Sequence, residues 1–173
     1  TICPKATEQE AYLFMQVCRA HGLSPWGDGE IYLVKFQDQP AYWVIGKQAY
    51  VNRGTIHPQY KSHESGLIGV DKDGGVHYHK GEFLPPGQTL AGSWCNIERR
   101  TQGPICETYS LADWEKKSQQ GLAMALWRTS KGAMMHKVAL KQTFREAFPD
   151  VFATVPVESE AFVDQEVTLE QSV

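Results

Sequence analysis

The sequence WRTSKGAMMHKVALKQTFREAFP, residues 127–149, predicts a long α-helix that begins at about residue 131 and ends at or before Pro149. Proline disfavours helical geometry in the residue that precedes it, which sets the C-terminal boundary. Lys137, Lys141 and Arg145 recur every four residues, so they share one side of this helix. Like charges at that spacing repel each other by roughly a few tenths of a kcal/mol per pair. The row is therefore either a solvated Lys/Arg face or a surface for an anionic partner.

The segments before this helix alternate between helix and strand patterns. Thr7 followed by Glu10 has the form of a capping box and predicts a first helix over residues 8–21, which Gly22 ends. Further predictions are paired strands at 30–36 and 41–46, a short helix at 47–54, and hairpins at 65–71/76–80 and 93–100/105–111. Residues 112–126 have no clear pattern. This order predicts an α+β fold with an antiparallel β-sheet of hairpins packed with helices and a long basic C-terminal helix.

The charges are distributed unevenly along the chain. All 17 Lys/Arg and 14 Asp/Glu lie in residues 1–149, a net charge of +3, whereas the remaining 6 acidic residues lie in 150–173 without a base. The sequence therefore predicts one core domain over residues 1–155 and an acidic, mobile tail over residues 156–173. No apolar run approaches the length of a membrane span, and no signal-peptide pattern opens the sequence. Four cysteines without CxxC spacing are typical of a reduced, cytoplasmic protein.

Several catalytic and metal-binding patterns can be weighed against simpler interpretations. The sequence contains no P-loop, GxSxG or HExxH motif. His77 and His79 alternate on one predicted strand without a third ligand, which favours surface histidines. Asp71 and Asp73 in the DKDGG segment fit a hairpin turn better than a calcium loop, because the sixth loop position lacks glycine. A metal-dependent nuclease site using Asp71, Asp73 and Glu82 remains an alternative function.

Cationic side chains lie close to aromatic ones at several places outside the long helix. Lys47 and Arg53 lie on the predicted short helix, Arg99 and Arg100 end a predicted hairpin strand, and Trp127 precedes the basic row. Lysine and arginine neutralise phosphates, and aromatic rings stack on exposed bases. This mixture suits single-stranded nucleic acid better than duplex readout.

Three segments follow one another along the chain: GLSPWGDGEIYLVKF (22–36), WVIGKQAYVNRG (43–54), and the pattern of Trp127, Met134 or Met135, Lys137, Ala139 and Arg145 to Pro149. Together they resemble the RecT/Redβ family of phage single-strand annealing proteins. Glu158 and Glu160 resemble acidic residues that follow the third motif in the family. The resemblance covers roughly residues 7 to 160.

The resemblance implies ATP-independent annealing of complementary single strands in phage-type homologous recombination, with no covalent chemistry and hence no enzymatic activity. It implies an annealing core that oligomerises into rings or helical filaments, a phage exonuclease as a partner, a phage- or prophage-encoded protein in the bacterial cytoplasm, and no membrane. No cofactor is required, and Mg²⁺ associated with bound DNA is left open. The candidate contacts to single-stranded DNA are Lys137, Arg145, Lys141, Lys131, Trp127, Arg128, Lys47, Arg53, Arg99 and Arg100. A structural phage protein that self-assembles through the basic helix is a third interpretation.

Overall fold

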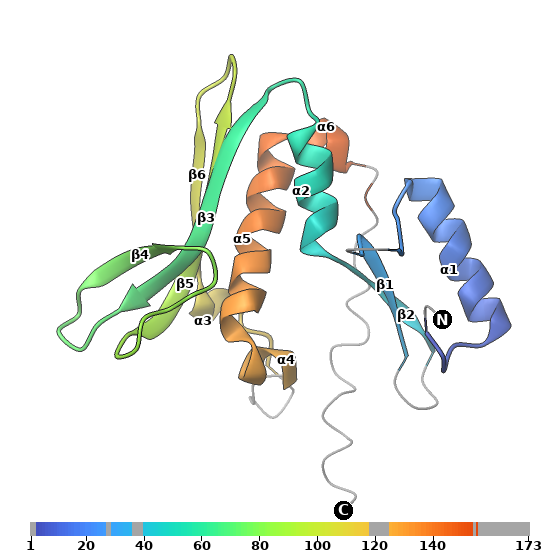
Figure 1. Cartoon of the computed structure of the whole chain (residues 1–173), viewed down its shortest axis with the longest axis horizontal. Helices are drawn as coiled ribbons and strands as arrows, with labels where there is room; N and C mark the ends of the chain where they lie inside the picture. The colour runs from blue at the N-terminus through green and yellow to red at the C-terminus, as the bar shows by residue number, and fades with distance from the viewer. Residues whose placement is uncertain (1–2, 27–28, 36–39, 118–124, 154, 156–173) are drawn as a thin grey trace, which may run out of the picture.

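A four-stranded antiparallel sheet forms one side of the molecule in the computed structural model, which describes residues 3–26, 29–35, 40–117, 125–153 and 155 (Figure 1). Its strands are β3 (Tyr60–Val70), β4 (Val76–Lys80), β5 (Thr89–Arg99) and β6 (Ile105–Ser110), in the spatial order β4-β3-β5-β6. The two predicted hairpins are present, and pairing between β3 and β5 joins them into one sheet. Both inner strands begin earlier than the sequence predicted, because this pairing extends them beyond their hairpins.

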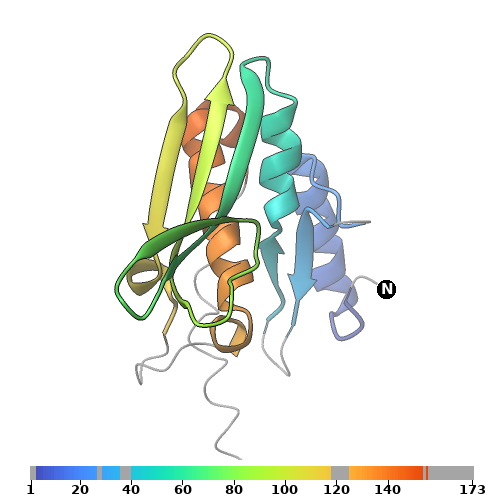
Figure 2. The same ribbon diagram turned by 60° about the vertical axis from the view of Figure 1, so that its left-hand side comes forward.

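The long helix α5 (Lys131–Ala147) packs lengthwise on one face of this sheet and lies between the sheet and α2 (Lys47–Thr55) (Figures 1 and 2). Its buried side is apolar apart from His136 and Thr143. Two hydrogen bonds add to this packing: Ser93 Oγ donates to the Met135 carbonyl at 2.7 Å, and the hydroxyls of Tyr109 and Thr143 lie 3.2 Å apart.

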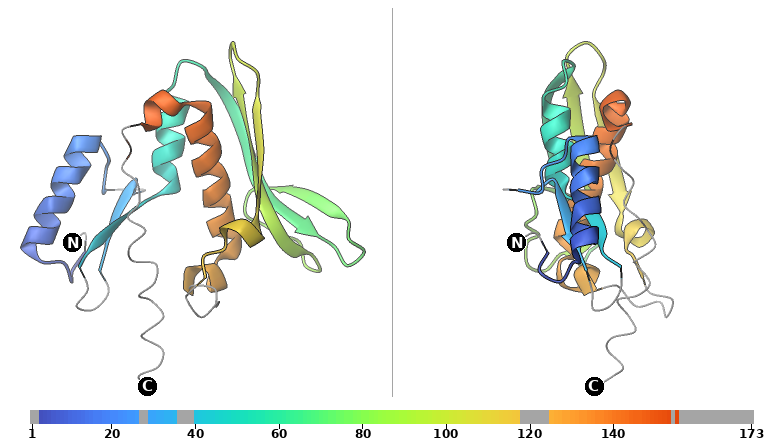
Figure 3. Two further views of the ribbon diagram at one scale, coloured as in Figure 1. Left: turned by 180° about the vertical axis from the view of Figure 1, so that it is seen from behind. Right: turned by 90° about the vertical axis from the view of Figure 1, so that its right-hand side faces the viewer.

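The remaining elements extend from α2 away from the four-stranded sheet. The strands β1 (Ile31–Val34) and β2 (Tyr42–Ile45) form an antiparallel ribbon, and α1 (Glu8–His21) packs on its far side (Figure 3). The short helix α6 (Pro149–Phe152) follows α5 directly. Side chains from both ends of this arrangement, including Phe14, Ile31, Tyr50 and Phe144, form one continuous core.

The start of α1 is fixed by the predicted capping box. The Thr7 hydroxyl accepts a hydrogen bond from the Glu10 amide, and the Glu10 carboxylate accepts one from the Thr7 amide. The same carboxylate binds Lys35 Nζ at 2.8 Å and accepts from the Ala41 amide at 2.9 Å. One side chain therefore both caps α1 and ties it to the segments that follow β1 and precede β2.

The predicted α+β class with antiparallel strands and packed helices is confirmed. Residues 112–126, which had no clear pattern, include most of α3 (Leu111–Trp114) and the beginning of α4 (Ala125–Thr129). The predicted tail, residues 156–173, lies outside the described residues. Among the helices that are described, none is both long and apolar enough to cross a membrane.

Candidate nucleic-acid interface

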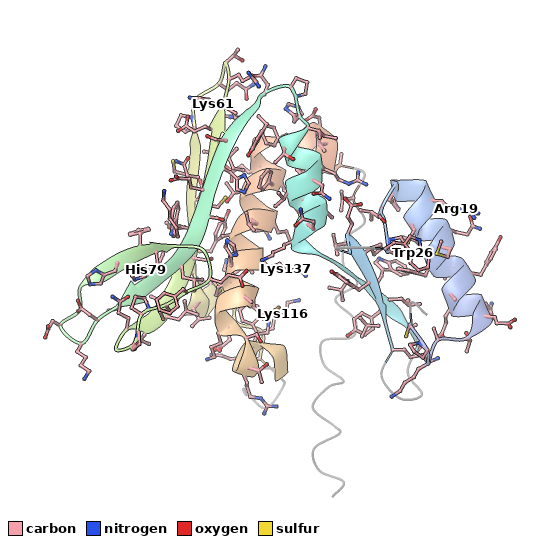
Figure 4. The ribbon with its side chains drawn as sticks, in the orientation of Figure 1. Arg19, Trp26, Lys61, His79, Lys116 and Lys137 are labelled. Atoms are coloured by element: carbon pink, nitrogen blue, oxygen red, sulfur yellow. The ribbon has the colours of Figure 1, made fainter. Side chains whose placement is uncertain are left out.

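The predicted cationic row lies on one side of α5 in the structure. Lys137, Lys141 and Arg145 are all partly exposed, whereas the residues between them that face inward are buried. Figure 4 shows Lys137 on the side of α5 that is turned away from the sheet, next to the beginning of α2. The α-helix repeat places successive members of the row about 6 Å apart along the axis. The row is thus a line of partly exposed basic side chains along one rigid helix.

Lys141 at the centre of the row also contacts α2. Its ammonium lies 5.9 Å from the ring centroid of Tyr50, a residue that is itself almost completely buried. A cation over an aromatic face is favourable by roughly 0.5–1 kcal/mol at an exposed site. This contact positions the middle of the row against α2 and leaves the side chain partly exposed.

Two further predicted contacts flank the row through ion pairs. Lys131, the first residue of α5, binds Glu115 at 2.6 Å. Lys47, the first residue of α2, binds Glu82 at 2.5 Å. Both lysine side chains are more than a third exposed, as is Glu82, whereas the Glu115 side chain is 12% exposed.

The other predicted arginine contacts, apart from Arg128, divide between two places. Arg53 reaches from α2 to the end of α1, where it donates to the carbonyls of His21 and Gly22. Arg99 donates to the Gly103 carbonyl at 2.9 Å, and Arg100 donates to the Tyr60 carbonyl at 3.1 Å. Arg53 therefore joins α1 to α2, and the arginine pair holds the tip of the sheet near Lys61, far from Lys137 in Figure 4.

The structure corrects the interpretation of Trp127 as a base-stacking platform. Its side chain is only 3% exposed and packs with Leu67 and Met135 in a small core cluster. Stacking on a base requires an open ring face, which this position does not offer. Arg128, the next residue on α4, is exposed.

A polar chain near the row was missed by the sequence analysis. Ser65 Oγ lies 2.8 Å from His136 Nε2, and His136 Nδ1 lies 2.8 Å from Glu82 Oε1. The same Glu82 oxygen binds Lys47 Nζ. The pKa of Glu82 is lowered, first by Lys47 and then by His136. The signal in the sequence is His136, a polar residue flanked by Met135 and Ala139 on the apolar side of the predicted helix.

The geometry does not support the alternative nuclease site. Asp71 accepts hydrogen bonds from the amides of Asp73 and Gly75 and contacts His77 at 2.7 Å, as expected of a turn residue. Glu82 is engaged elsewhere by Lys47 and His136. In the described part of the chain, no three His, Cys, Asp or Glu side chains are grouped in a way that could hold a metal ion.

The sequence model of the RecT family matches residues 1–172 of the 173-residue chain. The chain belongs to the RecT family. Membership of the RecT family was predicted from the three segments and is confirmed. RecT family proteins act by single-strand annealing in phage-type DNA recombination and are generally not catalytic. Comparison with curated protein sequences gave no significant match to an individual protein.

Proposed function

We propose that this chain binds single-stranded DNA and anneals complementary strands without ATP and without making or breaking a covalent bond. The observation that carries the proposal is the line of Lys137, Lys141 and Arg145 on one rigid helix, in a chain that the family model matches over residues 1–172. Repulsion between phosphates is the main barrier to bringing two strands together, and fixed cations lower it.

The proposed contacts fall into three groups. Lys137, Lys141 and Arg145 contact the phosphates directly, and Lys131, Lys47 and Arg128 extend the contact at the row's flanks. Arg53, Arg99 and Arg100 contribute less, because each already holds backbone carbonyls of the fold. The binding needs no readout of base edges, which suits annealing of any sequence.

The proposal also covers the oligomeric state, the partner that supplies the DNA, and the role of metal ions. Copies of the chain form rings or helical filaments, so that weak contacts on each copy add to a continuous track for the strand. A phage exonuclease supplies the single strand in the bacterial cytoplasm. No cofactor is required, and Mg²⁺ participates only as a counterion of the bound DNA.

The decisive experiment compares annealing of complementary fluorescent oligonucleotides by the wild type, Lys137→Glu and Arg145→Glu. Both variants are expected to lose annealing and to keep the circular dichroism spectrum of the wild type. Lys72→Glu on the exposed β3–β4 turn makes the same charge change away from α5 and serves as the control. Annealing by both α5 variants at the wild-type rate would overturn the proposal.

Salt dependence and product analysis separate this function from its alternatives. The logarithm of the affinity for oligo(dT) should fall linearly with the logarithm of the salt concentration, by about 0.7 for each phosphate contacted. A self-assembling structural protein would form oligomers with no affinity for the strand. A nuclease would shorten labelled DNA in the presence of Mg²⁺ or Mn²⁺.

A further inference from the structure

The Glu82 carboxylate lies between a lysine ammonium and a histidine ring nitrogen. Its Oε1 atom is 2.5 Å from Lys47 Nζ and 2.8 Å from His136 Nδ1. These two partners come from different helices, since Lys47 begins α2 and His136 lies in the first half of α5. The next residue on α5 is Lys137. One carboxylate oxygen therefore contacts both a lysine ammonium and a histidine ring nitrogen beside the basic row.

The Ser65 hydroxyl can hydrogen-bond to His136 Nε2 either as a donor or as an acceptor. In the neutral ring, Nδ1–H donates to Glu82 and Nε2 accepts from the Ser65 hydroxyl. In the imidazolium, Nε2–H donates to the same oxygen of Ser65, whose hydroxyl can act in both roles. His136 thus presents a donor to the Glu82 position whether or not it is charged.

The exposed side of this cluster belongs to Lys47 and Glu82. Their side chains are 45% and 38% exposed, whereas His136 is 11% exposed. A ligand arriving from solvent would therefore meet the ammonium and the carboxylate first. His63 is a further titratable group near His136, and its pKa is lowered by burial and by His136.

We propose that Lys47 and His136 form a phosphate subsite for single-stranded DNA, and that the Glu82 carboxylate occupies it until a backbone phosphate displaces it. Carboxylate and phosphate oxygens accept the same charge-assisted hydrogen bonds, so one can replace the other at these donors. Glu82 acts as an internal competitor that weakens the contact of each copy. The inference rests on the proposed function, because the phosphate is that of the bound strand.

Two glutamates of the chain allow a matched comparison. Glu82→Gln removes the competing charge and keeps the shape of the side chain. Glu64→Gln removes the same charge from another lysine pair, in which Glu64 lies 2.6 Å from Lys80. That pair joins β3 to β4, and Glu64 points to the opposite face of β3 from its neighbour Ser65, which contacts His136. A general electrostatic effect on DNA binding would be similar in the two variants.

The measurement is the affinity for oligo(dT), by fluorescence anisotropy at several salt concentrations. An exposed ion pair is worth up to about 1 kcal/mol, so Glu82→Gln is expected to bind up to about fivefold more tightly than the wild type. A plot of the logarithm of its affinity against the logarithm of the salt concentration should have a slope steeper by about 0.7, the value for one further phosphate contact. Glu64→Gln should show no such change in slope.

A double-mutant cycle tests whether the effect runs through Lys47. Lys47→Ala is expected to reduce affinity little in the wild-type background, because Glu82 already competes with phosphate for the Lys47 ammonium. It should reduce affinity strongly in the Glu82→Gln background, where nothing competes for the ammonium. Additive effects of the two substitutions would overturn the inference.

Lysine acetylation of the wild-type protein, read by mass spectrometry, tests the site without any variant. Oligo(dT) should protect Lys47 and leave Lys80 unchanged. Equal affinities and slopes for Glu82→Gln and Glu64→Gln, or no protection of Lys47, would overturn the subsite. The proposed function would survive that result as long as Lys137→Glu still abolishes annealing. If the wild type did not bind single-stranded DNA, both the subsite and the proposed function would be overturned.

Discussion

The phenyl ring of Phe144 on α5 lies against the backbone of Gly54, a position where α2 has no side chain of its own. A β-carbon on Gly54 would lie 2.1 Å from Cδ1 and 2.3 Å from Cε1 of this ring. Phe144 is completely buried and contacts other aromatic rings, among them Tyr60 and Phe148. The ring therefore cannot move aside without disturbing the core. This close approach sets the spacing of the two helices that carry Lys47 and the basic row.

Replacing Gly54 with alanine should destabilise the protein. Alanine favours a helix interior by about 1 kcal/mol over glycine, and overpacking of a core costs about 1–3 kcal/mol. A contact of 2.1 Å with a buried ring places this site near the upper end of that cost. The free energy of unfolding in urea should therefore fall by about 1–2 kcal/mol.

Gly103→Ala is the control for this prediction. A β-carbon at Gly103 meets nothing within 4 Å, in the turn between β5 and β6. Its effect on stability should stay within about 0.5 kcal/mol. Equal stability of both variants would show that α2 and α5 can separate without cost.

The elements of this fold could be predicted from local sequence, but their neighbours could not. The capping box at Thr7 and the break before Pro149 are local signals, and both gave the correct ends of a helix. The pairing of β3 with β5 depends on which hairpin lies beside which, and strand periodicity carries no such information. The candidate site shows the same division between local and distant information.

The cationic row follows from helical spacing alone, whereas the surroundings of its members do not. Trp127 was interpreted as a stacking residue because it precedes cations in the sequence. Its actual neighbour Leu67 comes from β3, at a distance in the chain that no local pattern spans. The Lys47–Glu82 pair likewise joins α2 to the loop between β4 and β5. Packing between distant segments therefore decides which of the predicted residues face solvent.

Glu10 should make the stability of the protein sensitive to acid. The Lys35 ammonium, followed by the amides of Thr7 and Ala41, lowers the pKa of Glu10 from 4.5 to about 2. A carboxylate with a lowered pKa in the folded state contributes stability above its unfolded pKa. That contribution is lost as the pH falls from about 4.5 toward 2, because the unfolded chain takes up the proton first.

Thermal unfolding of Glu10→Gln between pH 7 and pH 2.5 tests this expectation. The variant should melt below the wild type at neutral pH, and the difference should shrink as the pH approaches 2.5. Glu8→Gln, in the same first turn of α1 but exposed, should follow the wild type throughout. A difference for Glu10→Gln that is independent of pH would contradict the assigned contacts.

The cysteines should differ widely in their reaction with iodoacetamide. Burial raises the pKa of Cys95 to about 12, and its side chain is 1% exposed. The thiolate is the reactive form, so Cys95 should stay unlabelled in the folded protein at pH 8. Cys106 is exposed on β6 and should react first.

Mass spectrometry of peptides taken during labelling would measure both rates. Cys106→Ser should remove the fast reaction, and urea should make Cys95 reactive. Labelling of both cysteines at the same rate without denaturant would mean that β5 is accessible in the folded state.

Trp127 should matter for stability and not for contact with DNA. It is 3% exposed, and truncating a buried tryptophan to alanine typically costs about 3–5 kcal/mol. Trp127→Ala should therefore lower the urea midpoint sharply, and the molecules that remain folded should bind oligo(dT) as the wild type does. Binding is measured at a temperature where circular dichroism shows the variant to be folded.

Trp26→Ala provides the comparison, because Trp26 is 63% exposed and its removal leaves no cavity. Its stability should stay within about 0.5 kcal/mol of the wild type. Should Trp127→Ala keep its stability and lose affinity for oligo(dT), the ring must leave its cluster with Leu67 and Met135 to stack on a base. That result would restore the interpretation drawn from sequence and would require α4 to move away from α5 when the strand binds.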